Sequence, residues 1–476
     1  MDRSDQDFNS AFIHLITKEQ AWHYRILPKE NSNGELTLLC DEDVFDDFLA
    51  HELEVVLGKQ VRLEKQSAAV VSALLNLHYL KESGQHQFQK IAIAVEGEGF
   101  LNDLIHEART LKSSDIHIEI YEERCRVRIR IDGMMVERYV LKKNEYPALI
   151  NKIKIMANLD IAEKRLPQDG RINFRDADQQ FDIRVSILPT LHGEKVVLRL
   201  LNNNAANIDL NHVGFSDFDL ENYLQGVKRP NGIILISGPT GSGKTTTLYA
   251  TLKYLNKETR NILTIEDPIE YTLQGINQVQ LKESIGLTFA SALRTFLRQD
   301  PDVIMVGEIR DPETANMAIR AALTGHLVLS TVHTNSAWGT VSRLMDMGIP
   351  SFLVANTLNT SVAQRLVRLL CQHCKEKASF DPASYPKQFK PFTPVHEHYV
   401  AKGCEKCFYT GYSGRKAVYE VIPMDQELIL EIKKGNMYIN PLLEDRGIKT
   451  IGENAFGLFS SGQTTIEEIY PLLFTN

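Results

Sequence analysis

The chain has 476 residues, a length that corresponds to about three domains. It is 43% hydrophobic and 24% charged with a net charge of −8, which is ordinary for globular protein and argues against a general polyanion-binding function. It has no apolar run long enough for a membrane span, its N-terminus is unlike a secretory signal, and its six cysteines are too few for a disulfide framework.

Residues 1–80 are expected to form a small α+β domain. Glu35–Cys40 is typical of a strand after a turn, and Phe45–Leu57 has the apolar spacing of an amphipathic helix. Neither segment contains residues with catalytic spacing, so a docking role is predicted. A polar, glycine-containing stretch follows and indicates a linker over 81–96.

A second α+β domain is predicted over 97–204. Its segments Ser113–Ile120 and Arg124–Ile131 alternate apolar and polar residues, which indicates half-buried strands. The pair Asp132-Gly133 then indicates a tight hairpin turn that leads into another strand over Met134–Leu141.

One face of the strand over 124–131 carries four arginines, Arg124, Arg126, Arg128 and Arg130. Four like charges repel unless anions or carboxylates lie opposite, and the phosphate of a nucleotide on a neighbouring subunit is one such anion. An ordinary solvated strand surface is the alternative explanation. A loop after the next helical stretch adds two more candidates, Arg165 and Arg171.

An apolar, strand-like run ends at Ser237 and leads into a glycine-rich turn and a segment with helical spacing. Gly238–Thr245 matches the P-loop pattern, in which glycines let backbone N–H groups surround phosphates at the positive end of the next helix. Lys244 is expected to bind the β- and γ-phosphates of ATP, and Thr245 to bind Mg²⁺. A chance glycine turn before a helix is the alternative. The predicted nucleotide-binding residues are Gly238, Pro239, Thr240, Gly241, Ser242, Gly243, Lys244, Thr245 and Thr246.

The P-loop lies within a predicted parallel α/β core over 205–370, where strand-like segments alternate with helical ones. Further strands are expected at Ile262–Ile265, Val303–Val306 and Leu327–Thr331. Acidic residues or a histidine follow these strands, and ligands of such sheets bind beyond the carboxyl ends of the strands. These side chains are therefore expected to converge on ATP.

Glu308 is the candidate general base, because it follows a buried strand at that edge of the sheet. The Asp-Glu pair usual after such a strand is replaced here by Gly307-Glu308. This departure shifts metal coordination onto Thr245, water and the acidic residues after the strand at 262–265. A surface ion pair with Arg310 is the alternative role for Glu308.

Three carboxylates, Glu266, Asp267 and Glu270, follow one strand, and they repel one another unless a cation is near. Glu266 and Glu270 are therefore predicted to act at the metal–nucleotide site, whereas Asp267 is also consistent with a simple turn. His333 at another strand's end is assigned a role in sensing the γ-phosphate. His326, at the start of that strand, is expected at the opposite edge of the sheet.

The tail contains two C-x-x-C pairs separated by 29 residues, a spacing typical of a closed structural Zn²⁺ site. A redox pair would need a thioredoxin-like βαβ context, which this segment lacks. The zinc element is predicted over 371–410 and a helical region over 411–476. Cys40 and Cys125 lie in strand patterns and are expected in cores. The predicted zinc ligands are Cys371, Cys374, Cys404 and Cys407.

Four motifs in order resemble the secretion ATPases of the type II secretion and type IV pilus superfamily. They are the P-loop Gly238–Thr245, the acidic box Thr264–Tyr271, the segment Leu297–Asp311 and the histidine box Thr324–Thr334. The match extends from around Gly97 to the end of the chain and includes Ser114–His117 and Arg165–Arg171. The cysteine pairs resemble the secretion and pilus-assembly branch and separate the chain from pilus-retraction motors.

The resemblance implies an α/β fold with a RecA-like P-loop NTPase core. A PAS-like α+β domain and a small N-terminal docking domain precede the core, and a structural zinc insertion lies near the C-terminus. It also implies a cytoplasmic homo-hexamer, peripheral at the inner membrane, that contacts a platform protein and, through residues 1–80, a membrane-anchored docking protein. ATP is expected between the two main domains, and the residues that complete its site, some across subunits, are Arg128, Arg130, Arg165 and Arg171.

Type II protein secretion, driven by assembly of a pilus-like fibre, is the function that this resemblance favours. Assembly of a type IV pilus is the alternative, although the short N-terminal region resembles the secretion branch. A nucleic-acid motor is less favoured and no nucleic-acid partner is expected, because the net charge is acidic and no aromatic–basic groove pattern occurs. The intact Lys244, Thr245 and Glu308 argue against a non-catalytic scaffold.

Overall fold

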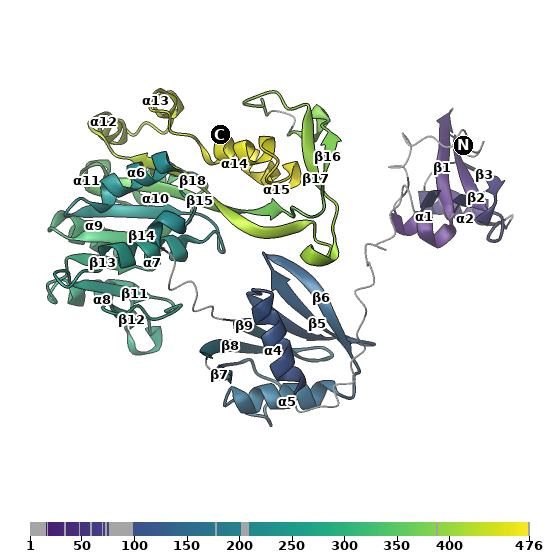
Figure 1. Ribbon diagram of the computed structural model, residues 1–476, viewed down its shortest axis with the longest axis horizontal. Coiled ribbons are helices and arrows are strands. Elements are labelled where there is room, and N and C mark those ends of the chain that lie inside the picture. Colours follow the sequence, from purple (N-terminus) through teal and green to yellow (C-terminus); the bar gives the residue numbers. More distant parts are fainter. Residues whose placement is uncertain are drawn as a thin grey trace. The chain divides into compact units, whose positions relative to one another are not determined.

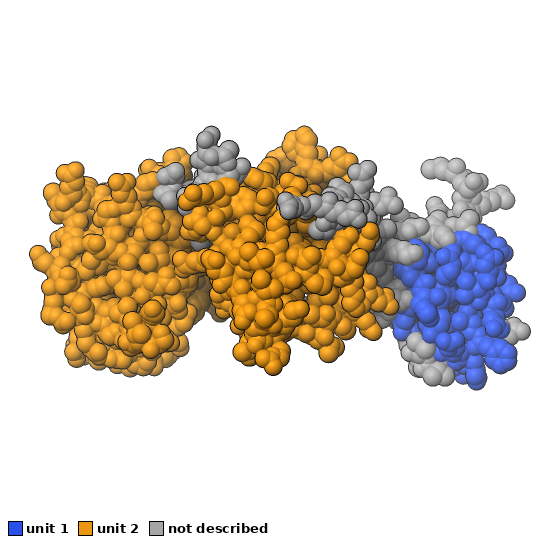
Figure 2. All heavy atoms as spheres, turned by 90° about the horizontal axis from the view of Figure 1, so that it is seen from below, with its two compact units in different colours: residues 1–91 blue, residues 92–476 orange. Residues whose placement is uncertain are grey.

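The computed structural model describes residues 16, 18–32, 35–46, 48–57, 60–68, 70–71, 74–75, 99–176, 179–200, 209–386 and 389–474. The chain divides into two compact units, residues 1–91 and 92–476, which Figure 2 colours blue and orange. The linker predicted over 81–96 and the domain boundary predicted at 204–205 lie outside the described residues. Within the described ranges, no helix combines the length and the apolar character that a membrane span requires.

The first unit contains a three-stranded sheet with the order β1-β2-β3 (Figure 1). Its elements are α1 Lys18–Tyr24, β1 Ile26–Ser32, β2 Glu35–Asp41, α2 Leu49–Leu57 and β3 Gln60–Gln66. β1 and β2 pair antiparallel, and β2 and β3 pair parallel. The helix expected over 45–57 begins only at Leu49. Residues 45 and 46 have no regular structure and follow a turn at 42–44, in which the Asp41 carboxylate accepts the Asp43 N–H.

The second unit begins with a six-stranded antiparallel sheet of order β6-β5-β4-β9-β8-β7, accompanied by two helices (Figure 1). The elements are α4 Phe100–Thr110, β4 Asp115–Ile120, β5 Cys125–Ile131, β6 Met134–Leu141, α5 Tyr146–Met156, β7 Gln168–Asp176, β8 Gln179–Thr190 and β9 Gly193–Leu200. Ile116, Val127 and Ile129 are fully buried, as the alternating pattern predicts. Asp132 and Gly133 have positive φ angles of 47° and 87°, which suit the predicted two-residue turn.

The rest of the second unit is built on a seven-stranded sheet of order β12-β11-β13-β14-β10-β15-β18, in which all neighbours are parallel except β15 and β18. The strands are β10 Gly232–Ser237, β11 Ile262–Glu266, β12 Asn277–Gln280, β13 Val303–Val306, β14 Leu327–Val332, β15 Leu358–Leu370 and β18 Tyr412–Pro423. α6 Asp217–Val227 precedes β10, and the helices between the strands are α7 Lys244–Leu255, α8 Phe289–Phe296, α9 Pro312–Leu323, α10 Gly339–Asp346 and α11 Ser351–Thr357.

The four central residues of β10, 233–236, are all apolar, which suits a strand with helices over both faces of the sheet. Ile233 and Leu235 pack in one core with residues of α8, α9 and α10. Ile234 and Ile236 pack in a second core with residues of α6 and α7. The strand is therefore held in the middle of the sheet, and its carboxyl end presents the glycine-rich turn at a fixed position.

The chain leaves the sheet after β15 and later returns to it through β18. In between lie β16 Lys375–Ser379 and β17 Glu397–Ala401, which pair antiparallel. After β18 come α12 Gln426–Lys434, α13 Asn440–Asp445, α14 Ile451–Ser460 and α15 Ile466–Ile469. Short 3-10 turns lie at Leu210–His212, Glu283–Ile285, Pro382–Ser384, Glu405–Cys407 and Tyr470–Phe474.

The helical region expected over 411–476 is corrected in its first part, where β18 occupies 12 residues. β18 pairs antiparallel with β15, from Tyr412 opposite Leu370 to Pro423 opposite Thr360. Its central residues, 417–422, are buried on both faces of the sheet and are apolar apart from Glu420, so they show no alternation of apolar and polar residues. Such a run has no period that distinguishes a buried strand from a buried helix.

Candidate active site

The glycine-rich turn connects the end of β10 to the first residue of α7. Gly238, Gly241 and Gly243 have positive φ angles of 151°, 82° and 87°. A Cβ atom at Gly238 would lie 2.4 Å from the Gln364 carbonyl oxygen, so only glycine fits between the turn and β15. The turn thus lies at the amino end of α7, where anions bind favourably.

Polar side chains in this turn suit a phosphate ligand. The Lys244 Nζ donates to the carbonyl oxygens of Gly238 and Pro239, at 2.7 and 3.0 Å. The Ser242 hydroxyl is buried and has no hydrogen-bond partner among the described residues. Burial lowers the pKa of Lys244 and Arg365 lowers it further, while the nearby Glu308 opposes them. An anion in the turn would satisfy the Ser242 hydroxyl and pair with the Lys244 ammonium.

Glu308 lies at the carboxyl end of β13, as predicted, with a mostly buried side chain that is 14% exposed. It forms an ion pair with Arg310 and lies 3.7 Å from the His333 Nε2. The ion pair with Arg310, which was the alternative role for Glu308, is therefore present. Glu308 is also close enough to Lys244 to act on the pKa of that lysine. A Cβ atom at Gly307 would lie 3.3 Å from the Ile265 carbonyl oxygen, so a side chain there would need a small shift of the neighbouring strand.

Glu266 is buried within the sheet, and its carboxylate is already hydrogen-bonded. It accepts from the Tyr249 hydroxyl of α7, from Thr264 Oγ1 at 2.6 Å and from Gln278 Nε2 at 3.1 Å. The Tyr249 oxygen in turn accepts the Glu270 N–H at 3.3 Å. Glu266 thus links α7 to β11 and β12, and its role toward a metal or nucleotide stays a prediction.

Glu270 contacts an arginine that the sequence analysis did not select. Arg184 of β8 lies 3.2 Å from the Glu270 carboxylate and donates to the Ile269 carbonyl oxygen, while its buried Nε has no partner among the described residues. Strand register places Arg184 in a row of cross-strand neighbours that crosses five strands. In order, the row is Arg130, Asp115, Arg199, Arg184 and Arg171.

The arginines predicted from the sequence lie in different surroundings. Arg128 makes two hydrogen bonds of 2.9 and 2.8 Å to Glu119. Arg130 lies 3.6 Å from Asp115 and donates to the Gly133 carbonyl oxygen, so carboxylates do lie opposite this strand face. Arg165 is 87% exposed beside Glu163. Arg171 is exposed on β7, at the end of the row that contains Arg184.

The two histidines of the histidine box lie at opposite ends of β14, as predicted. His333 follows the carboxyl end and is half exposed beside Glu308. The His326 Nδ1 lies 2.9 Å from the Ala321 carbonyl oxygen, at the end of α9 and before β14 begins. His326 therefore belongs to the end of a helix rather than to the nucleotide side of the sheet.

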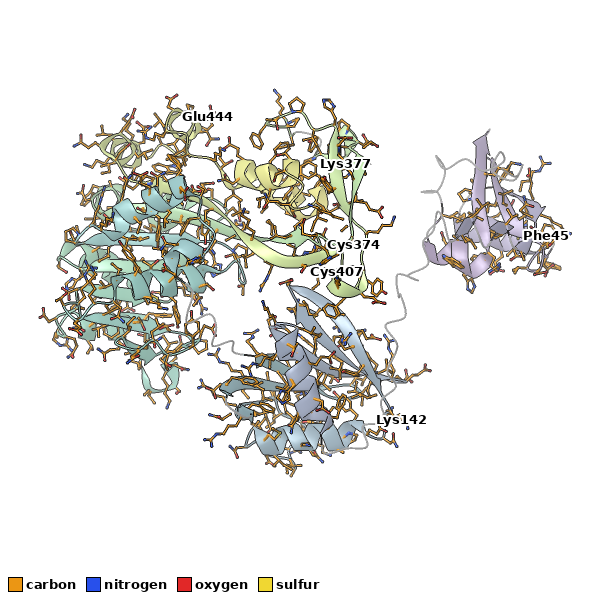
Figure 3. The ribbon with its side chains drawn as sticks, viewed as in Figure 1. Phe45, Lys142, Cys374, Lys377, Cys407 and Glu444 are labelled. Atoms are coloured by element: carbon orange, nitrogen blue, oxygen red, sulfur yellow. The ribbon has the colours of Figure 1, made fainter. Side chains whose placement is uncertain are left out.

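The four predicted cysteine ligands form one cluster, and Figure 3 labels two of its members, Cys374 and Cys407. Their sulfur atoms all lie within 4.8 Å of one another, with Cys371–Cys404, Cys374–Cys407 and Cys404–Cys407 separations of 3.9, 3.7 and 3.8 Å. A tetrahedron of sulfurs about 2.3 Å from Zn²⁺ has edges of about 3.8 Å, so the cluster fits that ion.

The parallel sheet, the glycine-rich turn and Lys244 define a P-loop nucleotide-binding protein of the α/β class. The family described as Type II/IV secretion system protein matches residues 95–471, and the chain belongs to this family.

Curated relatives agree with the family assignment. The chain is 47% identical over 379 residues to Type II secretion system protein E of Pseudomonas aeruginosa, an alignment that covers 78% of this chain and 74% of the relative. It is 46% identical over 382 residues to Type II secretion system ATPase E of Vibrio cholerae, with the same two coverages. It is also 39% identical over 505 residues to Type IV pilus assembly ATPase PilB of Myxococcus xanthus, covering 98% of this chain and 87% of the relative.

Solved structures share the fold. The Legionella pneumophila ATPase DotB superposes with a TM-score of 0.58 at 22% identity, covering 79% of this chain and 95% of DotB. The pilus retraction motor PilT with bound ADP superposes with a TM-score of 0.53 at 26% identity, covering 77% of this chain and 94% of PilT. The α/β architecture predicted for the core is thereby confirmed.

Proposed function

We propose that this chain is the ATPase of a type II secretion system, and that it powers secretion by driving assembly of a pilus-like fibre. The observation that carries the proposal is a complete P-loop beside Glu308 in a chain 47% identical to a type II secretion protein E. The chain is an ATP-hydrolysing enzyme of the secretion family. The assembly, membrane contacts and residue roles that follow are parts of the proposal.

In the proposed reaction, a water oxygen attacks the γ-phosphorus of ATP, the bond from that phosphorus to the bridging oxygen breaks, and ADP leaves. Backbone N–H groups of the turn, from residues of 238–245 other than Pro239, and the Lys244 ammonium hold the β- and γ-phosphates. Thr245 would hold Mg²⁺, which neutralises phosphate charge when bound. Glu308 orients the water and accepts its proton, and His333 beside it senses the γ-phosphate.

The arginines of the cross-strand row that contains Arg184 supply positive charge that stabilises the transition state. Arg184 extends the predicted set, because it already contacts the Asp-box carbonyl and carboxylate at Ile269 and Glu270. Cationic groups of this kind contribute on the order of 10³–10⁵ in rate. We assign part of this contribution to arginines of the neighbouring subunit in a homo-hexamer. Equal turnover per chain in dilute and assembled protein would contradict the assignment across subunits.

In the proposed assignment, the remaining regions support the ATP-hydrolysing site. Residues 97–204 form the PAS-like domain, 205–370 the RecA-like core, and 371–410 the element whose four cysteines would hold a structural Zn²⁺. Residues 1–80 dock on a membrane-anchored protein, and the hexamer works at the cytoplasmic face of the inner membrane against a platform protein. ATP binding closes the PAS-like domain onto the core and hydrolysis releases it.

The substitution Glu308→Gln tests the assigned base. It keeps the shape of the side chain and removes its ability to accept a proton, so turnover is expected to fall by about 10²–10⁴. Binding of a fluorescent ATP analogue is expected to stay within about twofold, because the P-loop is unchanged. Turnover is measured as phosphate release from assembled protein.

Two further variants separate catalysis from the ion pair with Arg310. Glu313→Gln changes an exposed glutamate of α9 and is the matched control, with turnover expected near that of the unchanged protein. Arg310→Ala removes the ion pair and leaves the carboxylate in place. If Arg310→Ala loses as much turnover as Glu308→Gln, the ion pair rather than proton transfer is what matters.

Type IV pilus assembly is the second candidate, because the PilB alignment covers 98% of this chain and so includes most of its first unit. A pull-down with the full chain on detergent-solubilised inner membranes separates the two. Capture of a secretion platform together with a single-span protein that has a large cytoplasmic domain supports type II secretion. Capture of pilus-assembly proteins instead supports the second candidate.

A further inference from the structure

Glu420 of β18 is a buried carboxylate that the nucleotide chemistry does not use. It is 3% exposed, and each of its oxygens accepts one backbone N–H. Oε1 accepts from Ala337 at 2.8 Å, and Oε2 accepts from Ile451 at 3.2 Å. Ile451 is the first residue of α14, where a negative charge is favourable. One side chain therefore joins two segments that are more than 100 residues apart in the sequence.

Ala337 belongs to a segment that begins at the active site. The segment 333–338 follows β14 and starts with His333 beside Glu308. Its Asn335 carbonyl oxygen accepts from Arg365 Nη2 at 2.9 Å, and its Ser336 carbonyl oxygen accepts from the Ser237 hydroxyl at 3.3 Å. Ser237 is the last residue before the P-loop. The segment is thus held by β10, β15 and β18, and Glu420 is its contact on β18.

We propose that Glu420 is a positioning residue that couples the nucleotide site to the C-terminal helices through the segment 333–338 and the N-terminus of α14. The inference rests on the proposed reaction at the P-loop. When His333 responds to the γ-phosphate, the segment that contains Ala337 changes its position or its rigidity. Glu420 passes this change to Ile451, because the same carboxylate binds both N–H groups.

The chemistry of the contact requires a carboxylate. Both partners are N–H donors, and an ionised carboxylate offers acceptors on both oxygens and no donor. Burial raises the pKa of Glu420, and the N–H groups of Ala337 and Ile451 and the charge of Arg365 oppose that rise. In Glu420→Gln, one oxygen becomes an NH₂ group that faces one of the two N–H donors, so one of the two connections is lost. Hydrogen bonds to charged groups are among the stronger ones in proteins, which makes the loss measurable.

Hydrogen–deuterium exchange of the full chain, with and without a non-hydrolysable ATP analogue, tests the coupling. In the unchanged protein, the analogue is expected to slow exchange in peptides over 238–250, 333–340 and 449–458. In Glu420→Gln, slowing is expected to persist over 238–250 and to disappear over 449–458. We further expect at least a tenfold lower kcat and a KM for ATP within about twofold, because the P-loop contacts remain.

Glu453→Gln is the matched control. Glu453 accepts the Thr450 N–H at 2.7 Å and so stabilises the same end of α14, but Glu420 is the carboxylate that contacts Ala337. The Glu453→Gln variant is expected to keep the response of α14 to the analogue, and its kcat should stay within about twofold of that of the unchanged protein. Equal losses in both variants would overturn the proposal, because a structural weakening of α14 would then suffice.

The unchanged protein provides a test that does not depend on how the variants fold. No slowing over 449–458, despite slowing over 238–250 and 333–340, would overturn the coupling and leave the proposed function intact. No slowing over 238–250 would instead contradict nucleotide binding at the P-loop, and with it the proposed function.

Discussion

At the scale of single residues, Glu119 explains how the arginine-rich strand face is tolerated. Its buried carboxylate accepts from Arg126, Arg128 and Lys195, with N–O distances between 2.8 and 3.1 Å. Burial raises the pKa of Glu119, but hydrogen bonds from Arg128, Lys195 and Arg126 outweigh burial and lower that pKa to about 2. The charged form is therefore strongly favoured in the folded protein, and it neutralises neighbours that would otherwise repel.

This lowered pKa predicts how stability depends on pH. A carboxylate with a lowered pKa in the folded state stabilises fully above its unfolded pKa of 4.5, and the contribution is lost as the pH falls toward about 2. The shift corresponds to at most about 3 kcal/mol. Glu119→Gln should lower the thermal unfolding midpoint at neutral pH by several degrees, and the difference from the unchanged protein should shrink on acidification.

The control for this prediction is Glu137→Gln on the neighbouring strand. Glu137 is more exposed and lies 3.4 and 3.9 Å from Arg126 and Arg124, so its removal should cost less. A midpoint difference for Glu119→Gln that stays constant from neutral pH down to the lowered pKa would show that charge is not the cause.

At the scale of elements, the cysteine cluster joins the two ends of the segment 371–407. β16 and β17 are mostly half-buried or exposed. In the turn after Cys404, the N–H groups of Cys404 and Gly411 donate to the Cys407 sulfur, at 3.2 and 3.3 Å. Such contacts orient metal-bound thiolates. The order of these strands should therefore depend on the metal.

Metal removal is the corresponding prediction. Elemental analysis of the purified protein should find one zinc ion per chain. Cys404→Ser should lose this zinc. Cys40→Ala, which changes a cysteine in the core of the first unit, should keep it. Chelation should speed hydrogen exchange in β16 and β17 before it weakens ATP binding, because binding free energy of structural zinc stabilises the local fold. Full zinc content in Cys404→Ser would contradict the four-cysteine site.

At the scale of the whole molecule, Arg184 connects the antiparallel sheet to the nucleotide-binding sheet within the second unit. Its guanidinium pairs with Glu270, and Glu270 in turn donates its N–H to Tyr249 of α7. α7 begins at the P-loop lysine, so a continuous set of contacts runs from β8 to the phosphate site. Movement of one sheet relative to the other would change the surroundings of bound ATP.

The substitution Arg184→Gln tests this connection. We expect kcat to fall at least tenfold, because the cation that the proposed mechanism assigns to the transition state and the link between the sheets are lost together. Arg175→Gln is the control, since Arg175 is an exposed arginine on the neighbouring strand β7. Turnover of Arg184→Gln equal to that of the control would remove Arg184 from the proposed mechanism.

The parts of the site that local sequence predicts are those whose geometry is local. The P-loop Gly238–Thr245 is recognisable because its strand, turn and helix are contiguous in the sequence. The cysteine cluster is recognisable because two closely spaced pairs supply the four ligands of one tetrahedral site. Arg184 and Glu119 were not predictable in the same way. Their partners come from strand register and from a second sheet, and alternation along one strand does not reveal which strand lies beside it. The strand β18 was missed because burial on both faces removes the period that distinguishes a strand.

The pairing of β15 with β18 has a consequence for how such chains can be shortened. Leu370 and Tyr412 are register partners, and the Cys371 N–H donates to the Gly411 carbonyl oxygen at 2.9 Å, so residues 371–411 leave and re-enter the sheet at one point. Their excision and replacement by a two-residue turn would keep every strand pair of the seven-stranded sheet. The sheet alone would therefore tolerate the shorter connection, and its closing loop would be entropically cheaper. The stretch also packs on α14, where the Phe380 and Phe459 rings lie 5.3 Å apart, so the same excision would uncover that helix.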